Sequence, residues 1–194
     1  QYRNLLQTLS SNKQTEKEYF GEEMLGSRST GDIRLENVAK SFGKHFTLKN
    51  INLIIPNGKI FGIIGVSGSG KTTLLRLIIG FYKPDIGNIN YNREKIKKII
   101  RDFGFATQSN SFYNNLTAEE NVMYFGKLHG LKGDELINRT GNALKVVELY
   151  DDRKTLSGNL SGGMQRRLDL ACASVNNPKV LILDEPTEDL DPYL

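Results

Sequence analysis

One stretch of the sequence restricts the fold more than any other. Residues 60–64 form a short, continuously apolar run, a glycine-rich segment follows, and residues 72–79 have the spacing of a helix. An apolar run without polar alternation is typical of a strand buried on both faces of a parallel sheet. A strand that leads through glycines into a helix therefore predicts an α/β fold.

The glycine-rich segment matches a pattern that binds phosphate groups. It fits G-x-x-x-x-G-K-[ST] with the residues Gly65, Val66, Ser67, Gly68, Ser69, Gly70, Lys71 and Thr72. Glycines let successive backbone N–H groups turn onto an anion, and the helix adds the positive end of its dipole. We expect Lys71 to neutralise the β- and γ-phosphates of a nucleotide, Thr72 to offer its hydroxyl to Mg²⁺, and Thr73 to belong to the same binding set. A chance match occurs in about one window in 30,000, which disfavours the alternative of a plain surface turn.

A second chemical feature is an apolar strand that ends in two carboxylates. Val180–Leu183 is followed at once by Asp184 and Glu185. Since the carboxyl ends of parallel strands share one edge of a sheet, we expect these acids in the same crevice as the phosphate loop. There Asp184 would hold Mg²⁺ and Glu185 would be the general base on the attacking water. Solvated acids at an ordinary strand end are the alternative, which the phosphate loop disfavours.

The rest of the chain alternates strands with helices. The apolar positions Ile33, Leu35 and Val38 predict an edge strand, residues 51–55 a second strand and Phe103–Ala106 a further buried one. Helices are predicted over Ala118–Leu128, 134–149 and 162–175, the first opened by a capping box, Thr117 with Glu120. This order predicts an α/β domain with a helical insertion.

Composition narrows the class of protein. The chain has 194 residues and one cysteine, which suits a single domain with a small appendage and excludes a disulfide-stapled mini-protein. No apolar run approaches the ~20 residues of a membrane span, and no signal peptide is visible. A net charge of +4 permits anionic partners without requiring them. A basic cluster (Arg93, Lys95, Lys97, Lys98 and Arg101) is a nucleic-acid patch or a solvated edge, and the lack of interleaved aromatic residues favours the solvated edge.

The first 31 residues are interpreted as a linker or appendage. An apolar stripe at helical spacing (Tyr2, Leu5, Leu6 and Leu9) indicates either a docking helix or a marginal helix of no consequence, and its shortness favours the marginal helix. The remainder up to residue 31 is mostly polar and interrupted by glycines.

Further motifs carry a family resemblance. Residues 160–165, Leu-Ser-Gly-Gly-Met-Gln, resemble the signature sequence of ATP-binding-cassette (ABC) ATPases. The family's other motifs occur along the chain in the order that the family shows. They are an aromatic residue at Phe42, a glutamine loop at Gln108, the acidic motif at 184–187 and a D-loop at 190–192. The resemblance covers residues 32–194. It implies a P-loop NTPase fold with a mostly parallel core sheet (32–108 and 176–194), antiparallel edge strands and an inserted helical subdomain (109–175).

The resemblance also implies a composite site for ATP and Mg²⁺. ATP would lie between the phosphate loop of one chain and the signature residues Ser161, Gly162 and Gly163 of a second ABC ATPase domain, in a homo- or hetero-dimer. Gln108 would contact Mg²⁺ and the lytic water, so that Glu185, Lys71 and Gln108 form the catalytic set. Phe42 would stack on adenine, with Phe46 as the alternative.

Two features depart from the family pattern. Glu188 and Asp189 stand where the family has small residues, and like charges from two subunits would weaken dimer closure unless they are separated or paired with cations. The sequence also stops before the family's switch histidine, so we expect residues 1–194 alone to bind nucleotide weakly and turn it over poorly. Neither histidine of the sequence lies in a motif that matches the switch histidine. His45 is expected in a loop and His129 as a helix C-cap. Cys172 is expected to be a buried small hydrophobe, and Arg166 and Arg167 to face solvent or phosphate.

The resemblance is strongest to the ATPase components of drug and lipid exporters. It implies an ATPase at the cytoplasmic face of a membrane that drives export with a transmembrane domain or subunit, with no nucleic-acid partner expected. A soluble cassette ATPase acting on ribosomes or chromosomes is the second hypothesis. A regulatory cassette that binds ATP without hydrolysis is disfavoured, because Lys71, Gln108 and Glu185 are all present.

Overall fold

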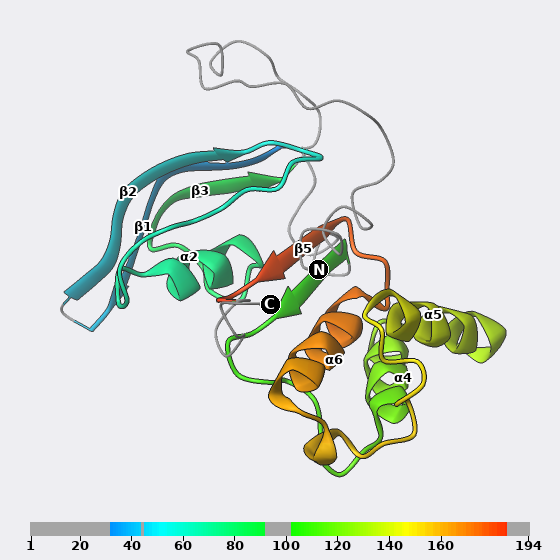
Figure 1. Ribbon diagram of the computed structural model, residues 1–194. Helices are drawn as coiled ribbons and strands as arrows, with labels where there is room; N and C mark the ends of the chain where they lie inside the picture. The colour runs from blue at the N-terminus through cyan, green and yellow to red at the C-terminus, as the bar shows by residue number, and fades with distance from the viewer. Residues whose placement is uncertain (1–31, 44, 92–101, 186–194) are drawn as a thin grey trace, which may run out of the picture. The chain divides into compact units, whose positions relative to one another are not determined.

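The computed structural model of the protein describes residues 32–43, 45–91 and 102–185, whose helices and strands are drawn in Figure 1. The chain divides into two compact units, one holding the described residues up to 91 and the other those from 102. The predicted N-terminal stripe and linker lie outside the described residues. So do the basic cluster and the segment from residue 186 onward, which includes Glu188, Asp189 and the D-loop motif.

The first unit contains an antiparallel sheet of three strands. These are β1 (Ile33–Phe42), β2 (His45–Ile55) and β3 (Ile86–Tyr91), in the order β2-β1-β3. Both edge strands pair antiparallel with the central β1. Leu35 and Val38 of β1 are both buried although they are three residues apart. A register shift between them, with Asn37 at φ 51°, restores the inward direction of the side chain, as a bulge does.

The helix of this unit is α2 (Lys71–Ile78), whose apolar residues Leu74, Leu77 and Ile78 are buried. The hydroxyl of Tyr91, at the end of β3, donates hydrogen bonds to the carbonyls of Ile78 and Leu77. Burial raises the pKa of Tyr91, which favours the protonated hydroxyl that donates these hydrogen bonds. The C-terminal turn of α2 is thereby fixed to the sheet.

Two features of this unit differ from the sequence prediction. Residues 60–64 do not form a strand, and Ile60 and Ile64 are 72% and 99% exposed. An apolar run becomes a strand only where a neighbouring strand supplies backbone partners, and here β2 and β3 each pair with β1 and not with residues 60–64. The sequence did not predict β3, because glycine and asparagine, which disfavour strands, make up half of it. Its Gly87 has φ 82°, and a Cβ there would lie 2.3 Å from the carbonyl oxygen of Glu36.

Asp85 makes the first unit sensitive to acid. Its carboxylate accepts hydrogen bonds from Lys40 Nζ, the Ser41 N–H and the Ser41 hydroxyl, each at 2.7 Å. The Lys40 and Ser41 hydrogen bonds lower its pKa from 3.8 to about 2. A lowered folded-state pKa stabilises the fold fully above the unfolded pKa, and this contribution is lost as pH falls through the folded value. We therefore expect Asp85→Asn to lower the urea midpoint at neutral pH, with a difference from wild type that shrinks towards about pH 2. A difference that does not change with pH would contradict this assignment.

The second unit combines a parallel strand pair with a group of helices (Figure 1). The strands are β4 (Phe103–Ala106) and β5 (Val180–Leu183), and the helices are α4 (Ala118–Leu128), α5 (Gly133–Val146), the 3₁₀ turn η3 (Ser157–Asn159) and α6 (Gly162–Ser174). Phe103 pairs with Val180 and Ala106 with Leu183. The core between the helices contains Val122, Leu144 and Leu168, none of which has any exposed surface. Burial of these side chains is the main source of stability for such a layer.

The N-terminus of α4 forms the predicted capping box. The Glu120 N–H donates to the Thr117 hydroxyl at 3.2 Å, and the Thr117 N–H donates to the Glu120 carboxylate at 2.8 Å. One turn later Asn121 is fully buried. Its side chain accepts from the Tyr113 N–H at 2.8 Å and donates to the Tyr113 carbonyl at 2.9 Å and to the Ser157 hydroxyl at 2.8 Å. The loop before α4 is thus joined to η3.

The predicted elements of this unit are confirmed closely. β4, β5 and α4 have the predicted bounds, while α5 runs over 133–146 instead of 134–149 and α6 ends at Ser174 instead of residue 175. Among the described residues, no helix has the length and apolar character of a membrane span. The partition into a core of 32–108 with 176–194 and a helical subdomain of 109–175 stays a prediction.

Candidate nucleotide site

The loop at residues 65–72 has the backbone that its glycines predict. Gly68 has φ 76°, and Gly70, the N-cap of α2, has φ 96°. A Cβ on Gly70 would lie 2.8 Å from Leu48 Cδ2, so both conformation and space require glycine there. Inside the loop the Ser69 N–H donates to the Val66 carbonyl at 3.2 Å. The result is a tight turn that leads directly into a helix N-terminus, the arrangement that favours anions.

Lys71 is the cation of this loop. Its ammonium group donates to the carbonyl of Gly65 at 2.9 Å and to that of Val66 at 3.2 Å. The side chain therefore folds back over the loop instead of extending into solvent. Thr72 and Thr73 follow as the second and third residues of α2. The loop residues, Lys71 and both threonines thus belong to one short segment of the first unit.

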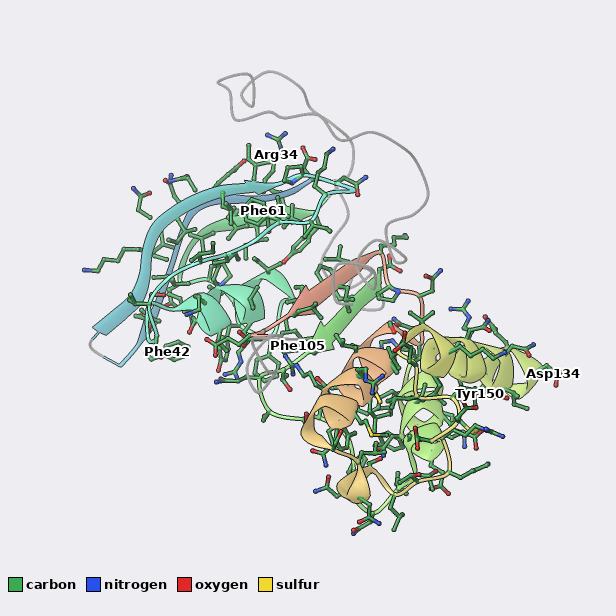
Figure 2. The ribbon with its side chains drawn as sticks, in the orientation of Figure 1. Arg34, Phe42, Phe61, Phe105, Asp134 and Tyr150 are labelled. Atoms are coloured by element: carbon green, nitrogen blue, oxygen red, sulfur yellow. The ribbon has the colours of Figure 1, made fainter. Side chains whose placement is uncertain are left out.

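Phe42 lies at the end of β1 (Figure 2) and is 47% exposed. Its ring meets that of Tyr82 edge to face at 5.3 Å, and Lys40 Nζ lies 5.7 Å from its centroid. The sequence did not predict Tyr82 as a neighbour of Phe42, although two adjacent aromatic residues follow α2. The stacking of Phe42 on adenine stays a prediction, as does the alternative at Phe46, which is on β2 opposite Ser41.

The two carboxylates and the glutamine belong to the second unit. Asp184 and Glu185 follow β5, and the Asp184 N–H donates to the Ala106 carbonyl at 3.0 Å, which extends the ladder with β4. Gln108 Nε2 donates to Glu185 Oε2 at 3.1 Å. The fold thus brings together two predicted catalytic residues that are 77 positions apart in the sequence. Glu185 also has φ 49°, which is uncommon for a residue with a side chain.

The signature residues open α6. Ser161 is the N-cap, and its hydroxyl accepts from the Met164 N–H at 3.3 Å. A Cβ added to Gly162 or Gly163 would meet nothing within 4 Å. Neither glycine is therefore required by packing within this unit. The absence of side chains leaves the backbone N–H groups of this helix end open to close approach.

Several minor predictions can be compared directly with the structure. His45 was expected in a loop, but it begins β2 opposite Phe42, because the hairpin extends the ladder to its tip. His129 is the C-cap of α4 as predicted, with Nδ1 3.2 Å from Asn176 Nδ2, and burial lowers its pKa. Cys172 is buried as predicted, and burial raises its thiol pKa.

Of the two arginines after the signature, Arg166 contradicts the prediction of solvent or phosphate contacts, whereas the Arg167 side chain is 34% exposed to solvent. Arg166 is buried and donates to backbone carbonyls at the ends of β4 and β5. Arg167 donates to the Val147 carbonyl at 3.3 Å and pairs with Glu148. Carbonyl groups at strand and helix ends need donors, and a guanidinium supplies five. The sequence feature that could have indicated a buried Arg166 is Asp169, which lies one helical turn later on the apolar side of α6 and can pair with it.

A glycine loop that leads into a helix, with a lysine folded over it, is the loop geometry of the P-loop class of proteins. The comparisons refine this class: residues 48–188 match the family described as ABC transporter. The chain therefore belongs to the ABC transporter family, and the predicted α/β fold of a P-loop NTPase is confirmed.

Two curated relatives and one solved structure illustrate the similarity. The chain is 39% identical over 173 residues to the Nod factor export ATP-binding protein I of Sinorhizobium fredii, covering 86% of this chain and 50% of the relative. It is 35% identical over 164 residues to the linearmycin resistance ATP-binding protein LnrL of Bacillus subtilis, covering 82% of this chain and 53% of the relative. The dimeric structure of MJ0796, a bacterial ABC transporter cassette, matches with a TM-score of 0.73 and 35% identity over 83% of this chain and 77% of that one. The chain spans about half the length of these curated relatives.

Proposed function

We propose that this chain binds ATP with Mg²⁺ and hydrolyses it to drive transport. The observation that carries the proposal is Lys71, whose ammonium group lies over the carbonyls of a glycine loop at a helix N-terminus. Lysine, loop N–H groups and helix dipole attract the same polyanion, because each presents positive charge to it. A nucleotide with a triphosphate tail is the ligand that fits this combination.

The acidic end of β5 supplies the residues proposed for chemistry. Glu185 would take a proton from the attacking water, and the Gln108 side chain, hydrogen-bonded to Glu185, would orient that water. Each unit offers oxygen donors of the hard type that Mg²⁺ prefers: the Thr72 hydroxyl in the first unit, and the Gln108 amide oxygen and the Asp184 carboxylate in the second. Bound Mg²⁺ would neutralise charge that develops on the phosphates.

The proposed active form is a dimer of ATP-binding domains. The α6 N-terminus supports this form, because Gly162 and Gly163 present backbone without side chains at a helix end that favours anions. The signature residues of one domain would then close over the nucleotide on the phosphate loop of a second, in an arrangement with two equivalent sites. The similarity to a cassette solved as a dimer supports the same form.

We further propose that this dimer works with a transmembrane domain or subunit at the cytoplasmic face of a membrane. Family membership and the name of one relative, a Nod factor export protein, support a transporter that moves its substrate outward. The substrate pathway belongs to the transmembrane partner in such an arrangement.

Replacing Lys71 tests the nucleotide site. Lys71→Ala in the full-length protein is expected to weaken ATP binding by about 10- to 100-fold, since charge-assisted hydrogen bonds to phosphate contribute about 1.5–3 kcal/mol. Titration of a fluorescent ATP analogue with Mg²⁺ measures the change. Lys59→Ala is the matched control, because it removes an exposed lysine of the same unit and is expected to leave affinity unchanged. Equal affinity of wild type and Lys71→Ala would contradict the proposed site.

A further inference from the structure

Arg166 joins the backbone beside two proposed catalytic residues. It is 6% exposed, and its Nη1 donates to the Thr107 carbonyl at 2.6 Å, next to Gln108. Its Nη2 donates to the carbonyls of Asp184 at 3.0 Å and Glu185 at 3.2 Å. One buried guanidinium therefore bonds the segment after β4 and the segment after β5. Lysine cannot copy this contact, since its ammonium is a point charge without a planar fork.

The Glu185 backbone needs such a constraint. Its φ of 49° lies in the left-handed region, where a side chain costs about 1 kcal/mol or more. A residue stays in this conformation only when its surroundings impose it. The hydrogen bond from Arg166 to the Glu185 carbonyl is one such constraint, and the bond from Gln108 to the Glu185 carboxylate is another.

Asp169 completes the arrangement with a negative charge. It is fully buried, and its Oδ2 lies 3.5 Å from Arg166 Nη1. Its Oδ1 accepts from the Ser111 N–H at 3.1 Å and from the Ser111 hydroxyl at 2.5 Å. A buried cation is tolerated when it is paired and fully hydrogen-bonded. Through Asp169, α6 also holds Ser111, so the segment after β4 is fixed to this helix at both Thr107 and Ser111.

We propose that Arg166 is a positioning residue that fixes Gln108 and Glu185 relative to each other, with Asp169 as its counter-charge. This inference rests on the proposed ATPase function. Arg166 would touch neither nucleotide nor water, and would act by holding the backbone that carries the base and the amide. A misplacement of a catalytic group by about 1 Å is enough to lower a rate by about 100-fold, so loss of this contact is expected to change kcat more than ATP affinity.

The test compares Arg166→Lys with wild type in the full-length protein. The expected result is a kcat lower by about 10- to 100-fold, with an ATP dissociation constant within about threefold of wild type. A second measurement uses Gln108→Ala: because both residues act on one geometry, the double variant is expected to lose no more than the larger single loss. If Arg166 only stabilised the fold, its replacement would not lower kcat while leaving ATP affinity unchanged, and its effect would not depend on Gln108.

Arg139→Lys is the matched control. Arg139 also donates to a backbone carbonyl, that of Asn176 at 2.9 Å, and pairs with Glu135. Its replacement removes the same kind of contact away from Gln108 and Glu185, and kcat is expected to stay at the wild-type value. An unchanged kcat in Arg166→Lys, or multiplicative losses in the double variant, would overturn the positioning role.

Failure of the two proposals can be distinguished. A wild-type protein that neither binds nor hydrolyses ATP would refute the proposed function, whereas an active wild type with an equally active Arg166→Lys would refute only this inference. Should Arg166→Lys not fold, Asp169→Asn decides, because it keeps an oxygen for Ser111 and removes the charge opposite Arg166. A lower kcat with retained ATP affinity in Asp169→Asn supports the role, and an unchanged kcat overturns it.

Discussion

ATP turnover by the full-length protein is expected to fall by about 100-fold or more when Glu185 is replaced with glutamine, the loss typical of a missing general base. Glutamine keeps the size of the side chain, and its oxygen can still accept the hydrogen bond that Gln108 makes at 3.1 Å. It cannot take a proton from water. The fold and the ATP affinity should therefore survive while kcat is lost, and phosphate release under saturating ATP measures this loss.

Glu135→Gln is the control for this prediction. Glu135 is an exposed residue of α5 that forms an ion pair with Arg139 at 2.9 Å. Removing its charge makes the same chemical change in the same unit, away from Gln108 and Glu185, and kcat should be unchanged. The base assignment would be wrong if Glu185→Gln retained wild-type turnover. ATP-dependent dimerisation of Glu185→Gln, followed by light scattering, would in addition test the proposed dimer, since the bound nucleotide would no longer be hydrolysed.

The second large effect concerns stability at Gly104, in β4. A Cβ added there would lie 2.1 Å from the Ala173 carbonyl oxygen and 2.9 Å from Pro178 Cγ. The carbonyl belongs to α6 and cannot move without shifting the helix. We expect Gly104→Ala to lower the free energy of unfolding by about 3 kcal/mol, the upper range for overpacking a core. Urea denaturation followed by circular dichroism measures this change.

Gly141 offers a matched substitution with the opposite sign. It lies inside α5, and a Cβ there would meet Tyr150 Cε2 at 3.7 Å, an ordinary contact. Alanine favours a helix interior over glycine by about 1 kcal/mol, so Gly141→Ala should stabilise the protein. If both alanines changed stability equally, the close approach of β4 to α6 would be refuted.

Local patterns predicted most of the second unit. The capping box defines the start of α4 by two reciprocal hydrogen bonds between residues three positions apart, so a sequence pattern is sufficient to locate it. β4 and β5 are short apolar runs bounded by polar residues, and both were predicted with the correct bounds. The phosphate loop follows from its glycines, since Gly70 is required both by its φ of 96° and by the nearby Leu48 side chain.

What could not be predicted depends on contacts between distant residues. Residues 60–64 have the composition of a buried strand, yet strand formation requires partner strands that the pattern of the run does not specify. Arg166 was expected at solvent or phosphate, because a charged side chain is rarely buried. Its burial depends on three carbonyl groups that the fold brings to one point, from residues 59, 18 and 19 positions away. The Gln108–Glu185 hydrogen bond spans 77 positions for the same reason.

The buried Asn121 side chain has a mechanical consequence. It holds Tyr113 on the loop before α4 and the Ser157 hydroxyl of η3, four residues before Ser161. Because one side chain makes all three of these short hydrogen bonds, a shift of the Tyr113 backbone is expected to displace η3 and, through it, the segment that leads to Ser161.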